Sequence, residues 1–76
     1  MQAFDRELDT RGLNCPMPIL KAKKSIAELD DGQVLRVAAT DPGAVKDFEA
    51  FCRQSGHELL ESTAADNEFV FLIRKH

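Results

Sequence analysis

The spacing of apolar residues changes within the first half of the chain, and each spacing predicts an element. Apolar and charged residues first alternate with period two, which predicts a strand from Ala3 to Asp9. Between Ile19 and Leu29, apolar residues recur three and four positions apart, which predicts a helix from Pro16 to about Leu29. The chain is therefore expected to begin with a strand that is followed by a helix.

The rest of the chain repeats this strand-then-helix pattern and closes with two further strands. The segment Val34–Ala39 is rich in β-branched and aliphatic residues, which favours a strand. Asp41 offers a carboxylate to the free amides of a helix start, and Pro42 suits the first helical position. We expect this second helix to end at Gly56. The last two strands are predicted at His57–Thr63 and Glu68–Lys75, with residues 64–67 as their connection.

The predicted order β-α-β-α-β-β restricts the possible topologies. Strands joined through a helix are most simply parallel with a right-handed crossover, whereas the last two strands form a hairpin. The segment FVFLI, residues 69–73, is apolar on both faces, which suits a central strand. We expect an α/β (α+β) fold, a two-layer sandwich of one mixed four-stranded sheet in the order 1-2-4-3 with both helices on one face. The other face would carry Val70 and Leu72, either as an apolar patch for a partner or beneath a second copy of the chain.

Length, charge and cysteine content narrow the class of protein. At 76 residues, the chain is expected to form a single domain over residues 1–76. The net charge of −3 argues against nucleic acid as a direct partner. No apolar run reaches the length of a membrane span, and no signal segment is visible. A cytoplasmic monomer is expected, in which the two cysteines are free thiols.

The stretch GLNCPMPIL, residues 12–20, is the strongest candidate for chemistry. The first amides of a helix have no partner within the helix, so Pro16 and Pro18 fit its first turn without loss of hydrogen bonds. Cys15 then lies at or just before the N-cap, where free amides such as that of Met17 and the helix dipole would stabilise a thiolate. We therefore expect a lowered pKa and a reactive thiol at Cys15. Positive charge nearby comes from Lys21, Lys23 and Lys24.

The residues around Cys15 argue against two common kinds of cysteine chemistry. A thioredoxin-like site would need a second cysteine at the position of Pro18. No pairing with His or Asn suggests a cysteine hydrolase. Asp9 and Gly12 are predicted to shape the loop that presents Cys15. An activated cysteine without a general base is more typical of a carrier than of a complete catalyst.

The segment LDTRGLNCPMPILKAKKSI resembles the signature of the TusA (SirA-like) sulfur carrier proteins. In that signature a glycine precedes Cys-Pro-x-Pro at the start of the first helix. The likeness extends over nearly the whole chain. It includes Asp41-Pro42, Phe51-Cys52 and the closing Leu72-Ile73-Arg74-Lys75.

The resemblance implies a function in sulfur transfer and a sandwich like the C-terminal domain of a bacterial translation initiation factor. Cys15 would accept persulfide sulfur from a cysteine desulfurase and pass it to an acceptor protein. The sulfur would end in the 2-thiouridine of tRNA, or serve molybdenum cofactor synthesis, sulfur oxidation or selenium metabolism. Met17 stands where the tRNA-thiolation branch carries Glu, so these destinations stay open. No cofactor is implied.

Several other side chains have both a structural and a functional interpretation. Cys52 continues the helical stripe of Val45 and Phe48, which predicts a buried thiol. Spacing among the cysteines and histidines matches no zinc pattern, so no metal site is expected. Candidates for contact with a partner are Met17, Lys23 and Arg74. Arg74 belongs to a basic strand end that is favoured as a solubilising terminus, and passage of this end near the Cys15 loop is the alternative.

Two rival functions stay open at this point. One is a non-catalytic regulatory or interaction module in which Cys15 is incidental. The other is a redox sensor in which Cys15 is oxidised or pairs with Cys52. Burial of Cys52 would disfavour that pairing, so the accessibility of the two thiols separates these functions from a carrier.

Overall fold

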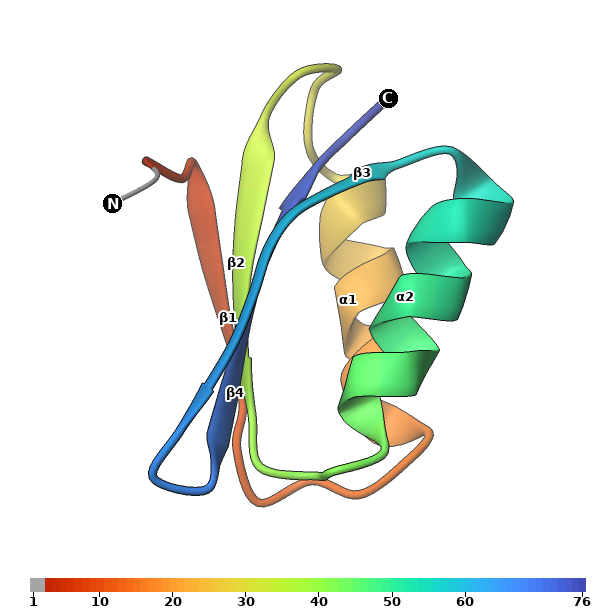
Figure 1. Ribbon diagram of the computed structural model, residues 1–76. Helices are drawn as coiled ribbons and strands as arrows, with labels where there is room; N and C mark the ends of the chain where they lie inside the picture. Colours follow the sequence, from red (N-terminus) through yellow and green to blue (C-terminus); the bar gives the residue numbers. More distant parts are fainter. Residues whose placement is uncertain (1–2) are drawn as a thin grey trace.

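Residues 3–76 are described by a computed structural model in which two helices cover one face of a sheet (Figure 1). The order of elements is the predicted one. Within the described residues, neither helix is long and apolar enough to cross a membrane. The elements are β1 (Arg6–Thr10), α1 (Met17–Ala27), β2 (Val34–Ala39), α2 (Ala44–Ser55), β3 (Glu58–Ala65) and β4 (Glu68–Arg74).

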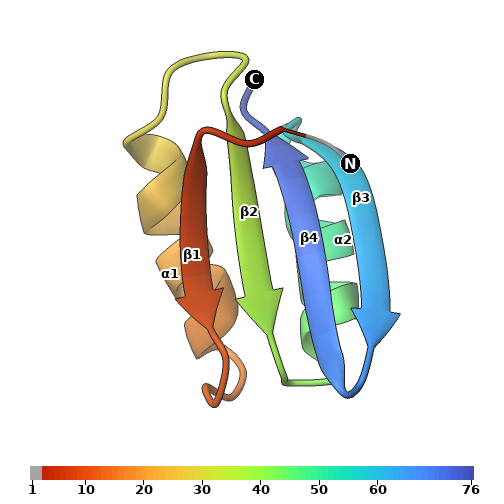
Figure 2. The same cartoon turned by 90° about the vertical axis from the view of Figure 1, so that its left-hand side faces the viewer.

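The sheet has the predicted strand order, β1-β2-β4-β3 (Figure 2). β1 runs parallel to β2, whereas β4 is antiparallel to both β2 and β3. The central place of β4 is reflected in three consecutive buried residues, Phe71, Leu72 and Ile73. Although the helices cover one face only, Leu72 on the other face is 3% exposed, so this central strand carries buried apolar side chains without alternation. The predicted α+β sandwich is therefore confirmed.

Both ends of β1 differ from the prediction. The strand begins at Arg6 rather than Ala3. At Asp5, just before this start, the side chain takes part in the contact with β2, because its Oδ2 accepts a hydrogen bond from the amide of Val34 at 2.8 Å. The strand also continues to Thr10, one residue beyond the predicted end at Asp9. Thr10 is fully buried, and its Oγ1 donates to the carbonyl of Ala38 at 2.6 Å. A buried hydroxyl with its own acceptor is compatible with a strand end.

The helix boundaries also differ from the prediction by about one turn or less. α1 ends at Ala27 rather than Leu29. Just beyond this end, the Nζ of Lys75 donates a hydrogen bond to the carbonyl of Leu29 at 2.5 Å, so this carbonyl has a side-chain partner in place of a helical amide. α2 begins at Ala44 with Gly43 as its N-cap, so Pro42 lies in the preceding turn and not at the first helical position. At the other end, a left-handed Gly56 ends α2 as predicted.

The hairpin between β3 and β4 is tighter than expected. Its turn consists of Asp66 and Asn67, which both adopt positive φ, as two-residue hairpins with the favoured twist require. β3 therefore runs to Ala65 rather than ending at Thr63.

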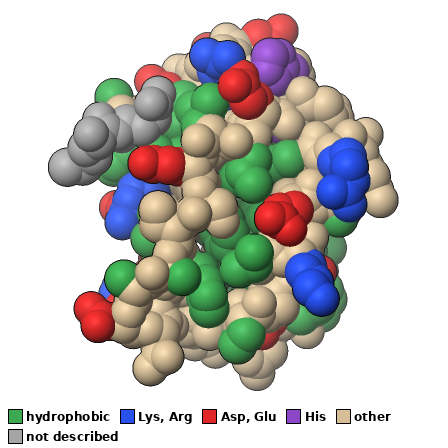
Figure 3. Space-filling view, in the orientation of Figure 1, with side chains coloured by type: hydrophobic (Ala, Val, Ile, Leu, Met, Phe, Trp, Pro, Cys, Tyr) green, Lys and Arg blue, Asp and Glu red, His purple; other side chains and the backbone are tan. Residues whose placement is uncertain are grey.

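The core lies between the sheet and the two helices. Phe48 of α2 stacks on Phe71 of β4, with ring centroids 4.6 Å apart, and both are fully buried. Cys52 is 6% exposed, which confirms the predicted buried thiol. Hydrophobic atoms are also visible in the middle of the face shown in Figure 3. Partly buried hydrophobic residues that pack against the core are Leu8, Ile19, Val45, Phe51, Leu59 and Phe69.

The helix-free face of the sheet is not the exposed apolar patch that the sequence suggested. Leu72 is 3% exposed and Val70 is half-buried. Charged side chains cross this face, among them Arg36, which pairs with Glu7 at 2.5 Å. Among the residues that the structure describes, the exposed large hydrophobic side chains are Phe4, Met17 and Leu20, and the latter two belong to α1.

Candidate functional site

Both helices start at the same end of the molecule, which brings two loops together (Figure 1). The loop before α1 follows β1, and the loop before α2 follows β2. Because β1 and β2 are parallel, their carboxyl ends meet at one edge of the sheet. Cys15 in the first loop is thereby placed beside Asp41 in the second.

Two hydrogen bonds join these loops, and a third within the second loop fixes the carboxylate that binds the backbone of Cys15. Gly12 has a φ of +82°, a conformation that favours glycine, and its amide donates to Thr40 Oγ1 at 2.9 Å. The amide of Cys15 donates to Asp41 Oδ2 at 2.7 Å, and the amide of Gly43 donates to Asp41 Oδ1 at 3.1 Å. Asp41 therefore ties the loop of Cys15 to the turn before α2. It is not the helix cap expected from the sequence, because Gly43 is the N-cap of α2 and no side chain among residues 3–76 caps this helix.

The two prolines lie at the start of α1, as the sequence suggested. Pro16 is the N-cap, Met17 the first helical residue and Pro18 the second, so Cys15 immediately precedes the N-cap. The peptide bond between Cys15 and Pro16 is cis. The amide of Met17 donates to the carbonyl of Asn14 at 2.9 Å. This amide is therefore already engaged and does not bind the sulfur, contrary to the expectation.

The thiol of Cys15 is exposed and points to a carboxylate. Its Sγ donates a hydrogen bond to Asp47 Oδ2 at 3.1 Å. Three causes raise the pKa of Cys15 above its ordinary value. The largest is this hydrogen bond, followed by the loss of water around the sulfur and by the negative charges of Asp47 and Asp41. The expectation of a lowered pKa is wrong, because the sulfur is hydrogen-bonded to the carboxylate of Asp47 and is also subject to the negative charge of Asp41.

Cys15 lies at a shallow groove between α1 and α2 with a volume of about 220 Å³. Lys23, a predicted partner contact, lines the same groove, and its Nζ lies 5.8 Å from the centre of the Phe51 ring. The groove thus combines a thiol, a carboxylate, an ammonium group and an aromatic ring. Its lining residues are Cys15, Pro16, Ile19, Lys23, Asp47, Ala50, Phe51 and Gln54.

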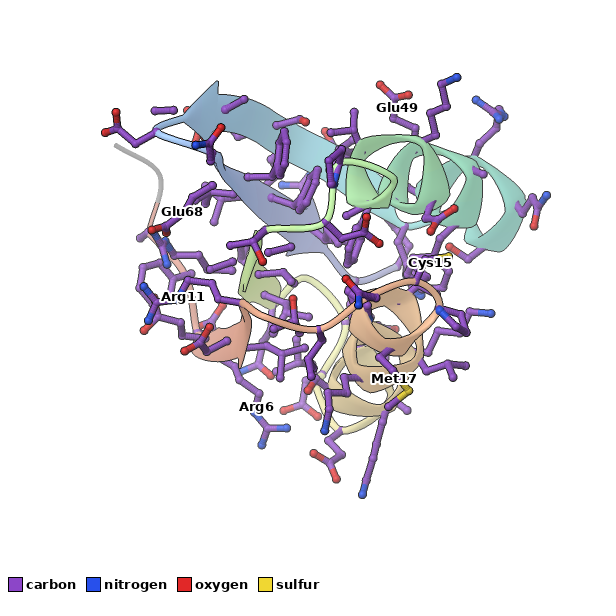
Figure 4. All side chains as sticks on the ribbon, turned by 90° about the horizontal axis from the view of Figure 1, so that it is seen from below. Arg6, Arg11, Cys15, Met17, Glu49 and Glu68 are labelled. Atoms are coloured by element: carbon purple, nitrogen blue, oxygen red, sulfur yellow. The ribbon has the colours of Figure 1, made fainter. Side chains whose placement is uncertain are left out.

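Exposed apolar surface also lies on α1, the helix that follows Cys15. Met17 is 41% exposed and Leu20 is 49% exposed. Figure 4, seen from the end that carries the loops, shows Cys15 near the starts of both helices and Met17 on α1. Two solvent-facing hydrophobic side chains one helical turn apart give α1 a small apolar surface, which lies outside the groove that Cys15 lines.

Two residues selected from the sequence lie away from the thiol. The carboxylate of Asp9 accepts hydrogen bonds from the backbone and side chain of Arg11, and both residues line a separate hollow of about 250 Å³. Arg74 pairs with Val34 in the sheet and with Glu58 through its side chain. It therefore lies at the opposite end of β2 from the Cys15 loop, and the alternative that this strand end passes near Cys15 is wrong.

Cys52 offers no second reactive thiol at the surface. Burial raises its pKa to about 11, and within residues 3–76 both cysteines are free. The same part of the chain contains no group of three or more His, Cys, Asp or Glu side chains arranged to hold a metal.

Sequence reasoning missed Thr40 and Asp47, which both contact the Cys15 loop. A signal for Thr40 was present, since it follows β2 and the ends of parallel strands adjoin. Asp47 lies in the first turn of α2, and an acidic residue there is usually explained by the helix dipole. Its contact with Cys15 depends on how the two helices pack.

The fold and the site together define a small α+β protein that presents one surface thiol at the start of its first helix. Residues 6–75 match the family model described as sulfurtransferase TusA. The chain belongs to the TusA family.

Known proteins agree with this assignment over nearly the whole chain. The sulfur carrier protein TusA of Allochromatium vinosum is 59% identical over 75 residues, which cover 99% of each chain. A Neisseria meningitidis protein with a provisional sulfur-carrier name is 54% identical over 67 residues, covering 88% of this chain and 90% of that one. The crystal structure of a SirA-like protein from Desulfitobacterium hafniense has a TM-score of 0.79 at 25% identity, covering 95% of this chain and all of that one.

Proposed function

We propose that this protein carries sulfur as a persulfide on Cys15, accepting it from a cysteine desulfurase and delivering it to an acceptor protein. The observation that carries the proposal is the contrast between an exposed thiol at the start of α1 and a buried one in α2. Membership of the TusA family and the high identity to a named sulfur carrier support it. The protein would act as a monomer in the cytoplasm, where thiols stay reduced.

The proposed transfer needs only thiol and persulfide chemistry. The thiolate of Cys15 attacks the terminal sulfur of the donor persulfide, the donor S–S bond breaks, and the donor cysteine leaves as a thiolate. Cys15 then carries the terminal sulfur. An acceptor thiolate attacks that sulfur in turn, and Cys15 leaves as a thiolate, so no external oxidant or reductant is consumed.

The surroundings of Cys15 suggest how donor and acceptor would reach it. Lys23 offers a positive charge in the groove of Cys15, and Met17 and Leu20 offer exposed apolar contact on the same helix. Gly12, Pro16 and Pro18 would keep the sulfur at this surface by fixing the loop and the helix start. The destination of the sulfur could be tRNA 2-thiouridine, molybdenum cofactor synthesis or sulfur oxidation, and Met17 is the residue we expect to influence that choice.

Sulfur loading provides the test. The wild-type protein, Cys15→Ser and Cys52→Ala are incubated with a cysteine desulfurase and cysteine, and their intact masses are measured. Wild type and Cys52→Ala should each gain the mass of one sulfur atom, whereas Cys15→Ser should gain none while keeping its circular dichroism spectrum. Equal loading of Cys15→Ser and wild type would contradict the proposal.

A further inference from the structure

We propose that Asp47 is a positioning residue for the sulfur of Cys15. In the carrier without bound sulfur, the carboxylate of Asp47 keeps Cys15 as a hydrogen-bonded thiol and disfavours an anionic sulfur at the same place. This inference rests on the proposed function of Cys15. Asp47 Oδ2 lies 3.1 Å from Cys15 Sγ, and both residues line the groove between α1 and α2. A carboxylate at this place accepts a hydrogen bond from the S–H group and repels a thiolate.

The charged groups around the sulfur come from three elements. α2 contributes Asp47, the loop before α2 contributes Asp41, and α1 contributes Lys23. Asp41 already accepts the amide of Cys15, and the Nζ of Lys23 lies over the ring of Phe51. Both carboxylates raise the pKa of Cys15, and the hydrogen bond to Asp47 is the largest cause.

The same carboxylate acts differently on a loaded carrier. A persulfide ionises more readily than a thiol, so its terminal sulfur has no proton to donate to Asp47. An anionic sulfur and a carboxylate repel each other at this separation. The terminal sulfur is therefore expected to turn away from Asp47 and toward solvent, where an acceptor can attack it. Asp47 thus distinguishes the empty from the loaded state.

The first test is the pH profile of Cys15 alkylation in the empty protein, followed by mass spectrometry of the peptide that contains Cys15. In Asp47→Asn the midpoint should fall by about 0.7 pH units, which corresponds to about fivefold more thiolate at pH 7. Asp47→Glu keeps the charge and should retain most of the wild-type midpoint. Glu49→Gln is the matched control, because Glu49 is exposed on the same helix and lies away from Cys15 (Figure 4).

A second measurement needs no variant. In carbon-13 NMR of the wild-type protein, the side-chain carboxyl signal of Asp47 should shift with pH at the alkylation midpoint of Cys15, and that of Glu49 should not. An unchanged midpoint in Asp47→Asn, or an Asp47 signal insensitive to Cys15 ionisation, would overturn the inference. Both measurements use protein without donor, so a failure of wild type to load sulfur contradicts the proposed function separately.

Discussion

The two cysteines show how one side-chain type acquires two roles from its surroundings. Burial in the core raises the pKa of Cys52 to about 11, whereas the pKa of the exposed Cys15 is raised chiefly by its hydrogen bond to Asp47. Cys52 is removed from water by the packing of α2. Cys15 is held by a surface contact that can exchange with a partner. Both thiols are therefore weakly acidic when the protein is empty, but only Cys15 is placed to react.

The largest expected difference between the thiols is their rate of alkylation in the folded protein. Cys15 is exposed, whereas Cys52 reacts only when α2 opens. Because opening of core elements costs several kcal/mol, Cys52 should react at least about a hundredfold more slowly than Cys15 at pH 8. Iodoacetamide labelling followed by mass spectrometry of the two cysteine peptides measures both rates.

Unfolding should abolish this difference. In concentrated urea the two cysteines lose their separate surroundings, so their rates should agree within a few-fold. Similar rates in the folded protein would show that Cys52 is accessible and would contradict the distinction between an exposed and a buried thiol.

A smaller effect is expected on stability at high pH. The pKa of Cys52 is raised from 9.0 to about 11 in the folded state, so the folded protein binds its proton more tightly than the unfolded chain does. This contribution amounts to about 2–3 kcal/mol of unfolding free energy below about pH 9 and is lost as the pH rises toward 11. Urea unfolding at pH 8 and pH 10.5 measures the loss.

The matched variant for the pH effect is Cys52→Ala. It removes this titration but leaves Cys15 and the lysines, so its unfolding free energy should fall less between the two pH values than that of wild type. An equal fall in both proteins would mean that Cys52 is not desolvated in the folded state.

The smallest expected effect concerns the link between the loops. Asp41→Ala removes two hydrogen bonds, to the amides of Cys15 and Gly43, and should lower the free energy of unfolding by about 1–2 kcal/mol. Asp31→Ala, an exposed acid in the loop between α1 and β2, should change it by less than about 0.5 kcal/mol. Urea unfolding at pH 7 compares them, and equal effects would show that Asp41 does not hold the Cys15 loop.

Much of the fold was predictable because the hydrophobic pattern is locally consistent. The apolar character of residues 69–73 correctly indicated that β4 is central, and the helical stripe through Phe48 correctly indicated a buried Cys52. Element ends were less predictable, because they depend on distant groups. α1 ends where Lys75, from the far end of the chain, binds the carbonyls of its last residue, Ala27, and of Leu29 just beyond it.

The site was predictable in its position but not in its electrostatics. The prolines correctly indicated that α1 starts just after Cys15. The helix dipole suggested a lowered pKa, but two carboxylates more than 25 residues away in the sequence contact Cys15: Asp47 contacts its sulfur and Asp41 its backbone amide. A short-range contact with a carboxylate outweighs a diffuse dipole at an exposed position. Only the packing of the two loops and helices reveals it.

The most direct test of the central claim is the location of the carried sulfur within the wild-type protein. After incubation with a cysteine desulfurase and cysteine, persulfides are trapped with an alkylating reagent and the protein is digested for mass spectrometry. We predict that the extra sulfur lies on the peptide containing Cys15 and that the Cys52 peptide carries none. Extra sulfur on Cys52, with Cys15 unmodified, would contradict the account.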